Sequence, residues 1–175
     1  MTSDTTSLAA PAARTEPPRA EQLVLSAYAR LAASKSPSVH RLRRGTQLMD
    51  AMLEPVFYEV KQQLGAHGHK WVKDENLACA LLLAPLLKGG KASLGRALSK
   101  ASFSELRFRQ LLACDSPAEL FTAAQRALRQ VDGAVSAHDV IRIALSWTEY
   151  GADATRKRLL ADFFSLELPP VAVAG

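Results

Sequence analysis

Apolar residues along this chain recur three and four positions apart, which is the spacing of an amphipathic α-helix. Three segments show it most clearly, with apolar faces made of Leu120, Phe121, Ala124, Leu128 and Val131; of Val140, Ile143, Ala144 and Trp147; and of Leu159, Leu160, Phe163 and Phe164. Basic residues fall on the opposite sides, namely Arg126 and Arg129, then Arg142, then Arg158. The alternating runs that indicate strands are missing. The pattern predicts an all-α protein, a compact bundle of about eight helices.

One segment, residues 76–87, is apolar nearly all round. A helix without a polar face is buried on every side. We therefore expect this segment to form the central helix of the bundle. Pro85 lies near its end and should strain the last turn, because proline removes a backbone donor and its ring clashes with the preceding turn.

Helix starts can be placed from capping chemistry. Ser116 followed by Pro117 predicts a helix start, with proline at the first helical position. Ser136 with Asp139 has a similar spacing. Ser102 with Glu105 fits a capping box, in which each side chain accepts from the free amide at the other end. Asp153 is the expected cap of the last helix.

The chain divides by composition into four parts. Residues 1–20 are rich in Ser, Thr, Ala and Pro without a helical period, and they predict a disordered tail. A transit peptide is the less favoured alternative, because Asp4 and Glu16 are acidic. Residues 21–90 and 91–168 are expected to form N-terminal and C-terminal helical lobes, hinged at the turn 88–91, and residues 169–175 a short tail.

Basic residues gather in three places, residues 35–44, 88–109 and 156–158, within a net charge of +5. Each run alone is typical of a solvated helix face, but three runs apart from the acids favour a polyanionic partner. Arginine predominates, and its planar fork matches phosphate oxygens in pairs. The candidate nucleic-acid-binding residues are Arg43, Arg44, Arg96, Lys100, Arg107, Arg109, Arg156 and Lys157. Arg107 has a structural alternative, an ion pair with Glu105 or Asp115.

The sequence favours contact with the nucleic-acid backbone over base reading. A helix-turn-helix drawn from residue 102 to 131 would open its second helix with Pro117, Ala118 and Glu119. Base contacts come from that first turn, and an acid there repels phosphate. Sequence-independent binding to phosphates fits the pattern better.

No motif indicates catalysis, a metal or a cofactor. His67 and His69 lack partners at metal-ligand spacing and predict a loop. Gly89-Gly90-Lys91 lacks the spacing of a phosphate loop and follows a helix instead of a strand. Cys79 and Cys114 lie in apolar segments, as buried reduced thiols do. We expect no enzyme and no membrane span, and a cytoplasmic location.

Several motifs resemble the CasB family, the small subunit of the type I-E CRISPR surveillance complex Cascade. They are Ser93-Leu-Gly-Arg96-Ala-Leu98, then 104–115 (Ser-Glu-Leu-Arg-Phe-Arg-Gln-Leu-Leu-Ala-Cys-Asp), preceded by 42–44 and 55–58 and followed by 145–147 and 156–163. Their order and spacing hold from about residue 24 to 165. The chain departs from the family pattern at residues 148–155, where acids precede the last basic run.

The resemblance implies a non-catalytic, all-helical subunit with two copies in the complex. They would brace the guide RNA–target DNA duplex and hold the displaced strand. The implied partners are the guide RNA, the target DNA, a second copy of the chain, and the backbone, large and RNA-end-binding subunits. The alternative is a free-standing helical protein that binds single-stranded nucleic acid or acts as a regulator.

Overall fold

The structure, a computed structural model, describes residues 16–165, and within that range it contains helices and no strand. The helices in chain order are α1 (Ala20–Ala33), α2 (Pro37–Arg44), α3 (Leu48–Met52), α4 (Pro55–Ala66), α5 (Asp74–Leu83), the 3-10 helix η1 (Ala84–Leu86), α6 (Leu94–Lys100), α7 (Glu105–Leu112), α8 (Pro117–Gln130), α9 (Ala137–Ser146) and α10 (Ala152–Phe164). The all-α prediction is confirmed. Short helices such as α3, with five residues, add to the expected number because they show no helical period in the sequence.

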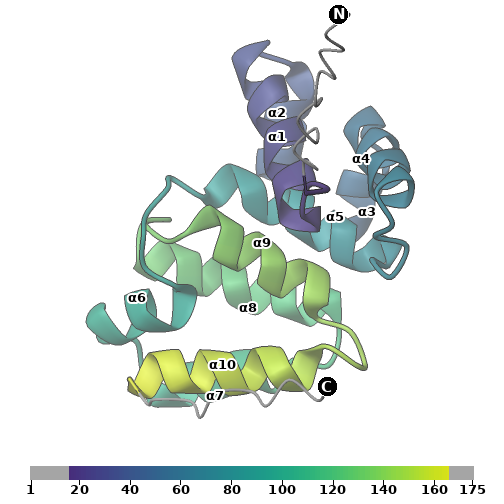
Figure 1. The fold of residues 1–175 in the computed structure, drawn as a ribbon. Helices are drawn as coiled ribbons and strands as arrows, with labels where there is room; N and C mark the ends of the chain where they lie inside the picture. Colours follow the sequence, from purple (N-terminus) through teal and green to yellow (C-terminus); the bar gives the residue numbers. More distant parts are fainter. Residues whose placement is uncertain (1–15, 166–175) are drawn as a thin grey trace, which may run out of the picture.

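The helices are arranged in three tiers (Figure 1). α1 to α4 lie at one end, α5, α8 and α9 in the middle, and α6, α7 and α10 at the other end. α5 is the central helix, as predicted, and every residue from Asn76 to Leu83 is buried. At Ala84 the α-helix changes to the 3-10 helix that contains Pro85, which is how the chain accommodates the missing donor.

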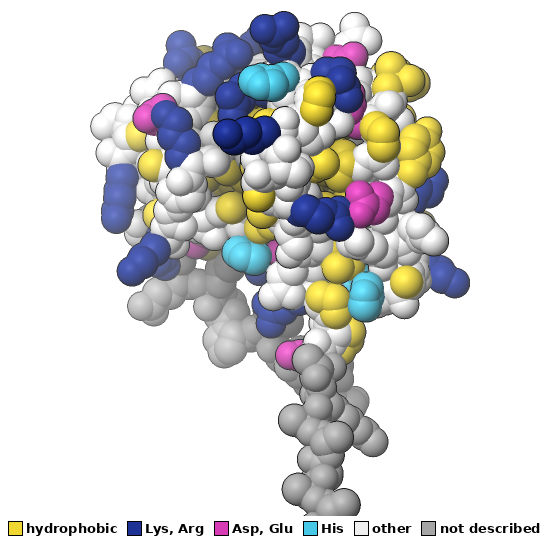
Figure 2. Space-filling view, turned by 90° about the horizontal axis from the view of Figure 1, so that it is seen from above, with side chains coloured by type: hydrophobic (Ala, Val, Ile, Leu, Met, Phe, Trp, Pro, Cys, Tyr) yellow, Lys and Arg dark blue, Asp and Glu magenta, His cyan; other side chains and the backbone are white. Residues whose placement is uncertain are grey.

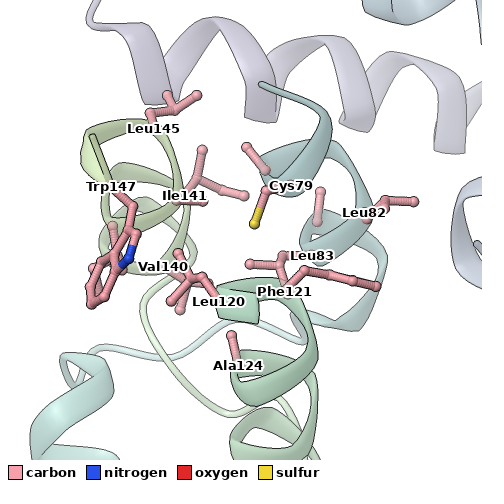
Figure 3. Packing of buried hydrophobic residues seen from close by; sticks show 14 of the residues in the cluster. Cys79, Leu82, Leu83, Leu120, Phe121, Ala124, Val140, Ile141, Leu145 and Trp147 are labelled. Carbon is pink, nitrogen blue, oxygen red and sulfur yellow. The ribbon is translucent and has the colours of Figure 1, made fainter. Parts of the chain in front are cut away.

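The core is one contiguous cluster of apolar side chains that extends across residue 90. Figure 3 shows its centre, where Cys79 and Leu83 of α5 face Phe121 of α8 and Ile141 of α9. Both cysteines are free and buried. Burial raises the pKa of the Cys79 thiol, which keeps it protonated. The division into two lobes at residue 90 stays a prediction, and α5 packs against helices from both proposed lobes.

Two of the predicted caps are confirmed. The Ser116 hydroxyl accepts a hydrogen bond from the amide of Glu119 at 3.2 Å, and the Ser136 hydroxyl accepts one from Asp139 at 3.3 Å. Each satisfies an amide that the first helical turn leaves free.

The other two predicted caps are wrong. Ser104, and not Ser102, caps α7, because Ser102 takes a left-handed backbone with φ of 55° in the turn after α6. Gly151 precedes α10, and Asp153 lies inside its first turn.

The structure describes only part of the two ends of the chain. The predicted N-terminal tail, residues 1–20, lies mostly outside the described residues. Helix α1 begins at Ala20, the last residue of the predicted tail. The 169–175 tail and the end of the second lobe also lie outside the described residues. None of the helices that the structure describes has the length and apolar character to span a bilayer.

Gly95 brings α6 unusually close to α10. A Cβ atom at this position would lie 2.7 Å from the Asp162 Cβ and 2.8 Å from the Leu159 carbonyl oxygen, so the helices would have to separate. We expect Gly95→Ala to lower the free energy of unfolding by about 1–2 kcal/mol, since overpacking outweighs the gain in helix propensity. Urea denaturation measures this change.

Gly65 of α4 provides the matched control, because nothing lies within 4 Å of its Cβ position. Gly65→Ala should raise the free energy of unfolding by about 0.5–1 kcal/mol through helix propensity alone. A Gly95→Ala variant that gained stability to the same extent would show that the close approach is absent.

Candidate nucleic-acid interface

α2 separates its basic residues into one structural arginine and two free ones. Ser36 caps the helix by accepting from the Ser38 amide at 3.3 Å, and Leu42 anchors it in the core. The Arg41 guanidinium donates to both carboxylate oxygens of Glu54, a nearly buried residue, and this contact lowers the pKa of Glu54. Arg43 and Arg44 are exposed, and no acid among the described residues lies within ion-pair distance of either.

Arg43 lies beside cations from two other parts of the chain. It lines a hollow of about 480 Å³ together with Lys88, which follows η1, and Arg129 of α8. We call this the α1–α8 hollow, because Tyr28 of α1 also lines it. Lys88 is held in place twice, by a backbone hydrogen bond to the Gly133 carbonyl at 3.0 Å and by an ion pair with Asp132. Basic runs that are 44 residues apart in sequence therefore meet here.

Arg107 lies in a second hollow on the other side of α8. This α7–α8 hollow has a volume of about 400 Å³ and is lined by Phe103, Arg107, Gln110, Ala123 and Arg126. The structural alternatives for Arg107 do not apply, because Glu105 pairs with Arg109 and Asp115 lies 3.5 Å from Arg156. Arg107 is exposed and has no acidic partner among the residues described.

α8 connects the two hollows through Arg126 and Arg129. Residues three apart share one helix face, so these side chains are neighbours. Both are exposed, and neither has an ion pair within residues 16–165. The sequence shows only that these two arginines lie opposite the apolar face of their helix. It does not show which residues of other segments lie beside them. We call Arg43, Lys88, Arg107, Arg126 and Arg129 together the α8 track.

Charges are unevenly distributed over the surface. Figure 2 looks down on the end of the molecule that carries α1 to α4, and there Lys and Arg side chains gather over one part of the face around a histidine. Apolar side chains collect over another part, and few acidic groups interrupt the basic area.

The remaining α6 and α7 candidates are exposed but belong to other surfaces. Arg96 and Lys100 lie four residues apart on α6, which packs against α10. Arg96 approaches Asp162 only loosely, at 3.8 Å, and is 67% exposed. Arg109 lies on another side of α7 from Arg107 and donates to the Glu105 carboxylate from both Nε and Nη2, so its charge is already paired on the surface.

Arg156, another predicted contact, is held by groups of the chain itself. Its Nε donates to the Leu112 carbonyl and its Nη2 to the Cys114 carbonyl, each at 2.8 Å, and its Nη1 donates to Asp153. The guanidinium also lies 5.2 Å from the centre of the Trp147 ring. It therefore caps the end of α7, and three of its five N–H donors are used within the chain. Lys157, next to it, is exposed.

Arg158 was expected to point away from the core, and this is wrong. Its side chain is 28% exposed, and its Nη2 lies 3.1 Å from the Asp139 carboxylate in an ion pair without a hydrogen bond. Burial lowers the pKa of Arg158, and Asp139 opposes that change. The other carboxylate oxygen of Asp139 accepts a hydrogen bond from the Leu94 amide at the start of α6. Asp139 therefore links α9 to both α6 and α10.

Comparison with known proteins identifies the family. The model for the family described as CRISPR-associated protein Cse2 matches residues 38–164, which include both hollows except Tyr28. A search of curated proteins finds no match. The match agrees with the resemblance drawn from the motifs above. Because it covers most of the chain, the protein belongs to the CRISPR-associated Cse2 family, also called CasB, the non-catalytic small subunit of the type I-E Cascade complex.

Proposed function

We propose that this subunit binds the sugar–phosphate backbone of nucleic acid along the α8 track, without reading sequence. Within Cascade this contact would stabilise the guide RNA–target DNA duplex and the displaced strand. One observation carries the proposal: five cations from four segments converge on one helix, and a single acid, Asp132, pairs with any of them in the described part of the chain.

The track is electrostatically costly without a partner. Like charges three or four residues apart on a helix repel each other, and Arg126 and Arg129 have no compensating acid in residues 16–165. A phosphate chain would relieve that repulsion and release its own counterions. Arginine suits this task because its fork binds two phosphate oxygens at once.

Weak backbone contacts are enough for the proposed role. The guide–target hybrid is about as stable as the DNA duplex that it replaces, so protein contacts can shift the balance. In an assembled complex the contacts act at high effective concentration, although the free chain would bind weakly. The other candidates remain proposed contacts to nucleic acid, to the backbone, large and RNA-end-binding subunits or to a second copy of the chain. They are Arg44, Arg96, Lys100, Arg109, Arg156 and Lys157.

Charge removal on α8 tests the proposal. A plot of log affinity against log salt concentration falls, and each phosphate contact to single-stranded DNA contributes roughly 0.7 to its steepness. We expect the double variant Arg126→Gln/Arg129→Gln to make this slope less steep by about 1.4. Fluorescence anisotropy of the full chain over a series of salt concentrations measures the slope. The same variant should shorten the retention of target DNA by the assembled complex.

The control is Lys61→Gln/Lys70→Gln, which removes the same charge from α4 and the loop that follows it. Its salt slope should equal that of the unchanged chain. The salt slope of Arg96→Gln/Lys100→Gln tests in the same way whether α6 contacts the phosphates. Equal slopes for the α8 and α4 variants would show that the track is not the binding surface, and unaltered target retention would reject the proposed function.

A further inference from the structure

The α1–α8 hollow has a shape that phosphate contacts alone do not require. A backbone can lie on a flat cationic surface, whereas this site is an open hollow of about 480 Å³, within the size range of about 300–1,000 Å³ that is typical of small-molecule sites. Its apolar lining comes from Pro85, Leu86, Leu87 and Leu128. The first three of these are only partly buried, so an apolar surface is left open beneath the cations.

The groups around this apolar lining match the parts of a nucleotide. Tyr28, which carries an aromatic ring, and Gln125, whose amide has both donors and acceptors, line the hollow. Arg43, Lys88 and Arg129 surround the same cavity, against one carboxylate, that of Asp132. Apolar and aromatic surfaces suit the face of a base, an amide suits its edge, and the arginines suit the phosphates on either side.

The cavity is held open by the backbone around it. Gly133 has φ of 68°, and a Cβ atom there would lie 2.2 Å from the Leu86 carbonyl oxygen, so the segment carrying Leu86 and Lys88 rests directly on this glycine. The Lys88 amide donates to the Gly133 carbonyl at 3.0 Å. The wall is therefore formed before any ligand binds, which limits the loss of entropy on binding.

We infer that the α1–α8 hollow receives one unstacked base of a single strand, while Arg43 and Arg129 hold the adjoining phosphates. The inference rests on the proposed function of the α8 track and adds that the chain binds unpaired strands through a base as well as through phosphates. A base inside a duplex is stacked on both faces and cannot enter, so the displaced strand fits this site and the guide–target hybrid does not. One ring in one hollow holds one base, and the amide of Gln125 selects no particular base.

The experiment compares two strands of equal charge, a 12-nucleotide oligothymidylate and an abasic deoxyribose-phosphate strand of the same length, binding to the full chain. We expect the oligothymidylate to bind about fivefold more tightly, which is the lower end of what base–aromatic stacking contributes. Tyr28→Leu keeps an apolar side chain and removes the ring, and it should bring this ratio close to one. Affinity for the abasic strand should not change.

Tyr58→Leu is the matched control, since Tyr58 is a tyrosine of α4 that is 62% exposed and does not line the hollow. Its ratio should stay at about fivefold. Gln125→Leu should lower the ratio in part, and this variant carries the test if Tyr28→Leu fails to fold. Thymidine monophosphate at millimolar concentration should displace the strand only partly, because it lacks the neighbouring phosphates.

The outcomes separate the two proposals. Equal, salt-dependent affinity for both strands would overturn the base-binding inference and leave the proposed function standing. No affinity for either strand would overturn both. Displacement by the monophosphate at the affinity of the whole strand would show a site for free nucleotides and overturn the inference, as would a ratio that falls equally in Tyr28→Leu and Tyr58→Leu.

Discussion

Asp139→Ala is expected to lower the free energy of unfolding by about 3 kcal/mol, the lower end of what breaking a buried ion pair costs. The Asp139 carboxylate is 7% exposed and serves three helices. It accepts from the Leu94 amide of α6 at 2.9 Å, pairs with Arg142 of its own helix at 2.9 Å, and lies 3.1 Å from Arg158 of α10. Alanine would leave the half-buried Arg158 and a buried amide without a partner.

Asp153→Ala is the control because Asp153 has the same local design. Each of these two acids lies in the first turn of its helix and pairs with an arginine three residues later, but Asp153 is 83% exposed. We expect Asp153→Ala to cost less than about 1 kcal/mol, as exposed ion pairs do. Urea denaturation of both variants gives the comparison. Equal losses would mean that the contacts to α6 and α10 contribute nothing.

The same pair of acids shows what the sequence can and cannot predict. Capping serines before Asp139 and before Glu119 follow from local spacing, and the structure confirms them. The tertiary role of Asp139 depends on where α6 and α10 dock, and no local pattern contains that information. The central helix was predictable for the opposite reason, because a segment apolar on every face has only one stable environment.

The candidate interface was predictable to a similar degree. Charge runs pointed to Arg43 and Arg107, which the structure places in two hollows along α8. Arg126 and Arg129 were missed because a basic stripe opposite an apolar face is typical of any solvated helix. Arg156 was included because it lies in a basic run, but its partners are carbonyl oxygens at the end of another helix, and residue types do not show which carbonyls are free.

Asn76→Asp is expected to have the largest effect of the changes considered, a loss of about 4 kcal/mol or more at pH 7. The Asn76 side chain is buried, and its Nδ2 donates to the carbonyls of Ala144 and Trp147, each at 2.8 Å. These bonds hold the end of α9 against α5. A carboxylate of the same shape would place an oxygen against two carbonyl oxygens and would bury an unpaired charge.

The pH dependence of this loss of stability shows whether the buried charge of the carboxylate causes it. Burial beside two carbonyls raises the pKa of the introduced carboxyl above its unfolded value of about 3.9, so the folded state binds the proton more tightly. Stability relative to the unchanged chain should therefore fall as pH rises through the folded-state pKa and recover in part toward pH 4, where the protonated group donates one hydrogen bond. Gln62→Glu, the same amide-to-acid change at an exposed position of α4, should cost little at any pH. A loss for Asn76→Asp that did not vary with pH would mean that the buried charge of the carboxylate does not cause it.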